Sequence, residues 1–178
     1  MKPEGMTPLH ESSERSVFRL EALNAYDVED EAEEIRAFEA GLPFPKVPGM
    51  EESMDLFRRM VARGVRLQRL HVVDLPLTPY LRYELAAYDG NVEAGEEILV
   101  ADRAWHPDLA ELTQDFALFD AETSHPSVVW MHYDASGKPG EYDYTEDPAD
   151  VAQCIRLRDI ALAHAVPLEE FRTLLKMD

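Results

Sequence analysis

The feature that most constrains the fold is a helix that passes through one tight turn into a strand, between residues 54 and 74. Apolar side chains recur at helical spacing along one stripe, at Met54, Phe57, Met60 and Val61. Gly64 is a good helix stop, and the β-branched segment Val65–Asp74 follows at once. This unit predicts helices that pack against a β-sheet.

The strand predicted at Val65–Asp74 has two unlike faces. Because successive strand residues point to opposite sides, Val65, Leu67 and Val73 share a face with Arg69 and His71. That face is apolar at its ends and polar in its middle.

Other segments complete the prediction. Short apolar runs predict strands at 16–23, 97–101, 115–120 and 127–134, and the first of these fits a helix almost as well; a turn at 135–140 leads to a hairpin partner around Tyr142 and Tyr144. One helix is predicted to follow the acidic residues of 27–34, and a second covers 79–88 and ends at Asp89, Gly90 and Asn91. Two more are predicted, from Pro148 to Pro167 and at 168–175. The predicted fold class is α/β (mixed α+β), with a central mixed β-sheet flanked by helices. Residues 1–14 are predicted to be a disordered leader and residues 15–178 a single α/β domain.

Charge narrows the classes of partner. The 178-residue chain carries 36 acidic and 17 basic side chains, a formal net charge of −19 at pH 7. A field of that sign repels phosphate backbones, and no segregated basic patch is evident, so direct binding of nucleic acid is not expected. A solvated surface that keeps the chain soluble is the favoured explanation; a basic partner or mimicry of nucleic acid is the alternative.

Location and cofactors are constrained by what the residue pattern lacks. No apolar stretch approaches the roughly 20 residues that span a bilayer, so no membrane association is expected. The lone Cys154 cannot form an internal disulfide, which agrees with a cytoplasmic location. The six histidines lack the spacing of common metal motifs, so neither a metal nor a cofactor is expected. A homodimer is left open.

The best candidate site is the densest polar group outside the acidic runs. It lies on the strand at Val65–Asp74 and on the helix after it, where ligand sites of α/β folds often form, and it consists of Arg66, Arg69, His71, Tyr80, Arg82 and Glu84. Arg69 and Arg82 suit a phosphate or carboxylate, and His71 and Tyr80 offer acid–base or hydrogen-bonding capacity. The favoured alternative is structural: Arg82 and Glu84 exposed on a helix, and Arg69 paired with a carboxylate such as Asp74.

Other constellations are weaker. No GxSxG elbow is present, and Cys154 is expected to be an inert thiol on a buried helix face. Acids at strand ends suit a metal or acid–base pair, although turn formation is favoured for them: Asp115, Asp120, Glu122 and Asp134. Aromatic residues suit a stacking surface, although core packing is favoured: Trp105, Trp130, Tyr133, Tyr142 and Tyr144.

Four segments together resemble an actinobacterial family known as domain of unknown function 6879. They are Val65–Leu85 (VRLQRLHVVDLPLTPYLRYEL), Asn91–Glu97 (NVEAGEE), Asp115–Asp120 (DFALFD) and Met131–Gly140 (MHYDASGKPG). The family commonly has Arg-Val-Arg in the strand where this chain has His71. The resemblance implies a companion of helix-turn-helix regulators, without known catalytic residues. It also implies one half of a phospholipase D-like architecture, but no histidine here has lysine two positions on, so the catalytic signature of that superfamily is missing.

The sequence therefore predicts a non-enzymatic regulatory or interaction domain that partners a helix-turn-helix transcriptional regulator. The alternative is a small anionic-ligand sensor or a (phospho)hydrolase-like enzyme with its pocket at Arg69, His71, Tyr80 and Arg82. A nucleic-acid-mimicking or antitoxin-like protein is a third hypothesis, and it requires the acids to form one continuous surface.

Overall fold

Seven strands form one mixed sheet in the computed structural model, which describes residues 5–176. They are β1 (Ser16–Glu21), β2 (Arg66–Val73), β3 (Glu97–Asp102), β4 (Phe116–Phe119), β5 (Ser127–Tyr133), β6 (Pro139–Thr145) and β7 (Val166–Pro167). Their order is β6-β5-β4-β1-β2-β3-β7. The three central strands β1, β2 and β3 run parallel, and every other pairing is antiparallel. The fold class predicted from the sequence is confirmed, whereas the phospholipase D-like half stays a prediction.

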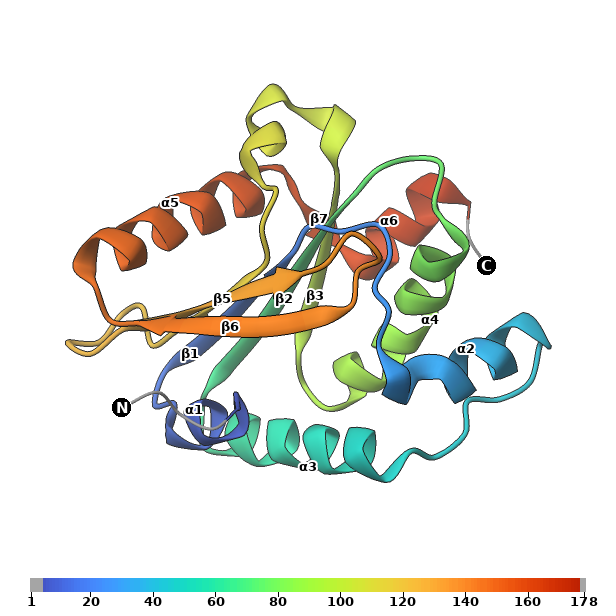
Figure 1. Cartoon of the computed structure of the whole chain (residues 1–178), viewed down its shortest axis with the longest axis horizontal. Helices are drawn as coiled ribbons and strands as arrows, with labels where there is room; N and C mark the ends of the chain where they lie inside the picture. The colour runs from blue at the N-terminus through green and yellow to red at the C-terminus, as the bar shows by residue number, and fades with distance from the viewer. Residues whose placement is uncertain (1–4, 177–178) are drawn as a thin grey trace.

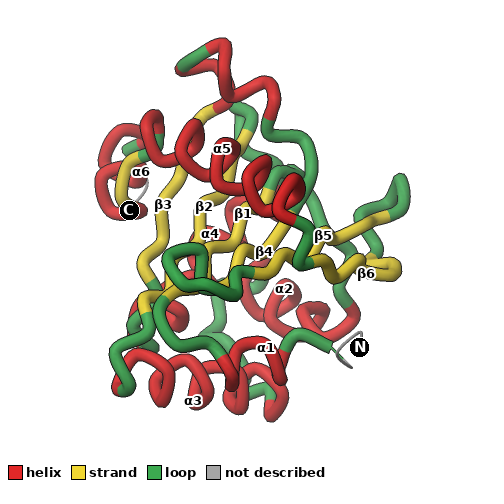
Figure 2. Tube along the Cα trace, turned by 90° about the vertical axis from the view of Figure 1, so that its left-hand side faces the viewer, coloured by secondary structure: helices red, strands yellow, loops and turns green. Residues whose placement is uncertain are grey.

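Helices cover both faces of the sheet (Figures 1 and 2). The α-helices are α1 (Thr7–Ser12), α2 (Ala32–Glu39), α3 (Pro48–Ala62), α4 (Pro79–Glu93), α5 (Pro148–His164) and α6 (Leu168–Leu175), and the short 3-10 helices are η1 (Glu29–Glu31), η2 (Arg103–Trp105) and η3 (Pro107–Glu111). Helix α5 lies across one face, whereas α1, α3 and α4 lie on the other (Figure 1). Among residues 5–176, none of these helices combines the length and the apolar composition needed to cross a membrane.

The apolar core is continuous on the face under α5 and divided on the other. Under α5, Leu20 of β1 and Leu70 of β2 pack with Cys154 in one cluster. On the opposite face, one cluster gathers around Leu67 and the helix α3, and a second gathers around Val73 and the helices α4 and α6. The polar residues of β1 and β2 lie between these two clusters. The predicted strand face, apolar at its ends and polar in its middle, is therefore confirmed.

The N-terminal segment corrects the sequence prediction of a disordered leader at 1–14. Residues 1–4 lie outside the described residues, but residues 5–14 contain the helix α1, so for them the prediction is wrong. The His10 ring packs against Phe57 and Phe119, with centroids 5.6 and 5.3 Å away, and Arg63 Nη2 donates to the carbonyl oxygen of Glu11 at 3.1 Å. These contacts with distant residues supply the order that the local composition does not indicate.

The end of α4 is a second correction. The sequence predicted an end at Asp89, Gly90 and Asn91, but the helix continues to Glu93. Gly95 ends it with φ +97°, and the N–H groups of Gly95 and Glu96 donate to the carbonyl oxygens of Val92 and Asn91, both at 3.0 Å. Glycine is the residue that adopts this left-handed conformation without steric cost.

Gly137, in the turn between β5 and β6, yields the first testable prediction. Its φ is +85°, and a Cβ there would lie 2.6 Å from the backbone oxygen of Ala25. We expect Gly137→Ala to lower the free energy of unfolding by about 3 kcal/mol, because backbone strain and a clash add. Gly64→Ala is the matched control: its φ is +90°, but nothing lies within 4 Å, so about 1 to 2 kcal/mol is expected. Equal losses in urea denaturation would show that the Ala25 contact is unimportant.

Candidate functional site

A buried ionic centre lies on the divided face of the sheet, where β1 and β2 run side by side. In the parallel register, Arg19 is paired with Arg69 and Glu21 with His71. Arg69 donates to Glu21 Oε1 at 2.9 Å through Nη1 and to Glu96 Oε1 at 3.0 Å through Nε. Arg19 Nε lies 3.2 Å from the same Glu21 oxygen. Two neighbouring arginines therefore share one carboxylate, and Arg69 has a second.

Glu21 is ionised in this centre although it is buried. Burial alone would raise the pKa of the Glu21 carboxyl, but the charges of Arg69 and Arg19, followed by His71 and the hydrogen bond from Tyr88, lower that pKa to about 2. The paired charges are mutually compensated, which is the condition under which buried ions are tolerated.

His71 is part of the floor of this centre and has no exposed surface. Its Nε2 lies 2.8 Å from the carbonyl oxygen of Leu23, which can only accept, so Nε2 carries a proton. Its Nδ1 lies 2.8 Å from the Tyr88 hydroxyl, which also hydrogen-bonds Glu21. Both ring nitrogens therefore tie β2 to its neighbours, one to the loop after β1 and the other to α4.

A second carboxylate pair lies at the mouth of the centre. The Tyr80 hydroxyl is 2.9 Å from Glu31 Oε2 and 3.0 Å from Glu84 Oε2. A hydroxyl has one proton to donate, so both contacts are hydrogen bonds only when one of the two carboxyl groups is itself protonated. Burial, followed by the charges of Glu21 and Glu31, raises the pKa of Glu84 to about 8, and burial raises the pKa of Glu31 to about 7. The pair holds a proton near neutral pH.

A cavity of about 380 Å³ opens above these groups. Its charged lining consists of Arg19, Arg69, Glu21, Glu31, Glu84 and Glu141, and its aromatic lining of Tyr26, Tyr80, Tyr133 and Tyr142. Tyr26 packs against Tyr80 and Tyr133, with ring centroids 5.7 and 5.0 Å apart, and donates to Asp115 Oδ2 at 2.7 Å. We call this cavity the tyrosine pocket.

The six residues predicted for the site separate into two groups. Arg69, Tyr80 and Glu84 line the tyrosine pocket, and His71 lies beneath it. Arg66 is exposed and forms an ion pair with Glu97 at 3.2 Å, and Arg82 is exposed on α4. The expectation that Arg69 pairs with a carboxylate is confirmed, but its partners are Glu21 and Glu96; Asp74, the partner named as an example, pairs with Arg103 at 3.3 Å. The expectation that Glu84 is exposed is also wrong, since only 7% of it is accessible.

The sequence prediction missed several residues of the site, among them Arg19, Glu21, Tyr26, Glu31 and Glu96. A signal for the first two was present. Arg19 and Glu21 alternate with Phe18 and Leu20 in the first strand, as Arg69 and His71 alternate with Leu70 and Val72 in the second. Tyr26 comes from a loop, Glu31 from the 3-10 helix η1 and Glu96 from the turn before β3, and only the folded chain brings them to the site.

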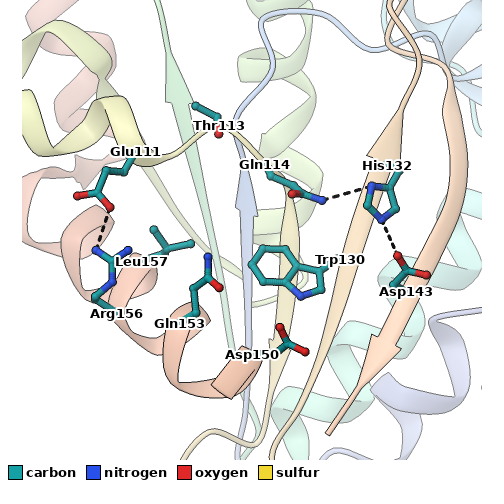
Figure 3. Close-up of a pocket in the computed structure, with 10 residues that line it drawn as sticks. All are labelled: Glu111, Thr113, Gln114, Trp130, His132, Asp143, Asp150, Gln153, Arg156 and Leu157. Atoms are coloured by element: carbon teal, nitrogen blue, oxygen red, sulfur yellow. Dashed lines mark hydrogen bonds and ion pairs between the residues drawn. The ribbon is translucent and has the colours of Figure 1, made fainter. Parts of the chain in front are cut away.

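A second, more open pocket of about 390 Å³ lies on the opposite face, between α5 and the strands β5 and β6 (Figure 3). Trp130 lies among polar side chains there, and His132 Nε2 is 2.9 Å from Asp143 Oδ2. Arg156 donates to Glu111 at 2.9 Å. These pairs are about half exposed, so solvent weakens them, and the pocket lacks the buried, fixed charges of the tyrosine pocket.

Two groups within residues 5–176 place possible metal ligands within 4.8 Å of one another. The first is His106, Asp108 and His164, but its imidazole rings stack at 3.9 Å with an interplanar angle of 13°. Nitrogen lone pairs lie in the ring plane, so nearly parallel rings do not converge on one ion. The second is Glu21, His71 and Glu84, in which both nitrogens of His71 are already hydrogen-bonded. Neither arrangement is a metal centre as it stands.

The acids expected at strand ends have structural contacts. Asp120 accepts from the N–H groups of Glu14, Arg15 and Ser16, and Asp134 accepts from the backbone of Ser136 and Lys138. Asp115 is buried and accepts from the N–H of Ala22 at 2.8 Å. These carboxylates fix turns and strand ends, as the favoured explanation predicted.

Cys154 yields the second testable prediction. The thiol is fully buried, and burial, followed by the charge of Asp150, raises its pKa to about 12. Since the thiolate is the reactive form, we expect the folded protein to react with Ellman's reagent at least about 100-fold more slowly than the protein in 6 M guanidinium. Equal rates in the two states would mean that α5 opens readily.

A protein-family model described as "Domain of unknown function (DUF6879)" matches residues 4–173. The match extends over all seven strands and both pockets. No curated protein matches the chain.

Proposed function

This chain belongs to the DUF6879 family, and we propose that it is a regulatory domain that binds a small molecule in the tyrosine pocket. The observation that carries the proposal is the pocket itself, a cavity of about 380 Å³ next to the carboxyl ends of β1 and β2, with buried charges of both signs and four tyrosines in its walls. Ligand sites in α/β folds form at such places.

Binding is favoured over catalysis by the way the charged groups are held. Arg69 is fixed by Glu21 and Glu96, and His71 is fixed by Leu23 and Tyr88. Groups tied to buried partners in this way are suited to orienting a ligand. A general acid or base must instead be free to exchange its proton with a substrate.

The segments around the pocket suggest how binding is transmitted. The wall combines the loop with Tyr26 and Val28, the helix α4 through Tyr80 and Glu84, and the hairpin of β5 and β6 through Tyr133 and Tyr142. A ligand that contacts all three ties them together and changes the surface they present. We propose that a helix-turn-helix regulator reads this change, as the family resemblance implies, which would place the domain in the cytoplasm.

The ligand part is tested by thermal unfolding in the presence of metabolites of three classes, cationic, anionic and uncharged. A ligand that binds only the folded state stabilises it, by about 2.7 kcal/mol at 100 times its dissociation constant. Gly140→Leu adds a side chain at the pocket wall, where a Cβ meets only His132 backbone atoms at 3.5 Å and beyond. We expect this variant to lose the stabilisation, and Gly90→Leu, at an open site on α4, to keep it. No stabilisation by any class would refute the proposal.

The partner part needs a separate experiment. Wild type and Gly140→Leu are used as baits in native extract, with and without the ligand from the thermal screen, and retained proteins are identified by mass spectrometry. Ligand-dependent retention of a helix-turn-helix regulator by wild type alone is the expected result. Failure to retain such a regulator would refute the partnership and leave the ligand site standing.

A further inference from the structure

We infer that the ligand of the tyrosine pocket carries an organic cation, a primary ammonium or a guanidinium group, bound between Glu31 and Glu84. The inference rests on the proposed function and names the class of ligand. A cationic ligand replaces the anionic ligand expected from the sequence, because the arginines are already paired with carboxylates whereas, within the described residues, Glu31 and Glu84 are not paired with a cation.

Carboxyl groups outnumber guanidinium groups around the pocket. Two guanidinium groups, Arg19 and Arg69, are surrounded by six carboxyl groups: Glu21, Glu31, Glu84, Glu96, Asp115 and Glu141. The arginines are matched by Glu21 and Glu96. An anion would have to displace a buried carboxylate from Arg69, which costs the ion pair it replaces.

Two of the remaining carboxyl groups, at the mouth of the pocket, have no cation beside them. Within residues 5–176, neither Glu31 nor Glu84 forms an ion pair, and each has the Tyr80 hydroxyl as its hydrogen-bond partner. Because a single hydroxyl lies between the two carboxyl groups, one of them keeps its proton. This proton occupies the position that a cation can take. An ammonium or guanidinium group has enough N–H donors to satisfy both carboxylates at once and releases that proton.

The walls of the pocket suit an organic cation better than a metal ion. At the pocket, Tyr26 packs edge to face against Tyr133 and in a tilted arrangement against Tyr80, and aromatic rings attract organic cations at short range. His71, the nearest nitrogen ligand, has both nitrogens in hydrogen bonds. A cavity of about 380 Å³ is also far larger than a single ion needs.

The inference is tested by isothermal titration calorimetry of the full chain with four probes: agmatine, 1,5-pentanediol, glutarate and magnesium chloride. Wild type is expected to bind agmatine and none of the others. Glu31→Gln and Glu84→Gln are expected to weaken agmatine binding at least tenfold, and Glu93→Gln, at an exposed position of α4, to leave it unchanged. Release of a proton is measured at pH 7.5 from the heats in two buffers of different ionisation enthalpy, neither of which is an amine.

The outcomes separate the ligand class from the proposed function. If the protein binds glutarate but not agmatine, the inference of a cationic ligand is wrong, and the proposal of a ligand-binding domain stands. Binding of magnesium that depends on Glu31 and Glu84, without agmatine, would replace the organic cation with a metal. If agmatine does not bind, while the metabolite screen finds uncharged ligands whose binding is lost in Gly140→Leu, the inference of a cationic ligand is wrong. If both experiments find nothing, the proposed function is wrong as well.

Discussion

Replacing Arg69 with methionine is expected to lower the free energy of unfolding at pH 7 by about 3 to 5 kcal/mol. The substitution keeps the apolar stem but removes the charge that compensates Glu21 and Glu96, both of which are buried. The remaining arginine, Arg19, contacts Glu21 but not Glu96. Urea denaturation of the variant measures the loss.

The control for this change is Arg66→Met in the same strand. The side chain of Arg66 is 66% exposed and pairs with an exposed carboxylate, so a loss below about 0.5 kcal/mol is expected. The pH dependence adds a second check. The charges of Arg69 and Arg19 lower the folded-state pKa of Glu21 from 4.5 to about 2, so the stability that Glu21 contributes is present above pH 4.5 and is lost as the pH falls towards 2. In Arg69→Met, the loss of stability between pH 4.5 and pH 2 should be smaller than in wild type. Similar costs for both methionine variants would contradict a buried ionic centre.

Glu84→Gln is expected to stabilise the protein at high pH, by on the order of 3 kcal/mol at pH 9. Burial, then Glu21 and Glu31, raises the pKa of Glu84 from 4.5 to about 8 against the opposing effect of Arg69. Between those values the folded chain holds a proton that the unfolded chain has lost, so stability falls as the pH rises from 4.5 to 8. Glutamine removes this dependence and keeps a donor for Tyr80.

Thermal and urea unfolding at pH 5 and pH 9 measure this effect. At pH 5 the carboxyl group is protonated in the folded state, and the variant should differ from wild type by less than about 1 kcal/mol. The other titratable groups near Glu84 are Tyr80 and Tyr88 of its own helix and His71 of β2. Glu93→Gln, exposed on the same helix, is the control and should show no gain at pH 9. A variant less stable than wild type at pH 9 would show that Glu84 is needed as an ion.

The sheet could be predicted because its strands carry strong local patterns. Arg69 and His71 interrupt an apolar strand face at a period of two, and this pattern alone predicts that they lie side by side on one face. The start of α4 is also locally encoded: Thr78 directly precedes Pro79, and its hydroxyl accepts from the N–H of Leu81 at 3.1 Å.

What could not be predicted depends on distant contacts. Helix α1 is held by Phe57 and Phe119, which are far from it in sequence. The end of α4 is an exception, because the left-handed turn at Gly95 is a local signal that the prediction of an end at Gly90 overlooked. Glu31 and Glu96 belong to local acid-rich or turn sequences, and nothing near them in sequence indicates that they meet Tyr80 or Arg69. The pairing of charges, which decides whether the pocket takes an anion or a cation, follows from tertiary structure alone.

The central claim is that a proton shared by Glu31 and Glu84 is replaced by a bound organic cation. Carbon-13 NMR of protein labelled at the glutamate carboxyl carbons tests it most directly, with Glu31→Gln and Glu84→Gln used for assignment. Without ligand, the two carboxyl groups are predicted to titrate near pH 7 and pH 8. With saturating agmatine, both should be ionised at pH 7. Titration of both groups near their ordinary value of 4.5 without ligand, or a proton that remains when agmatine is bound, would contradict the account.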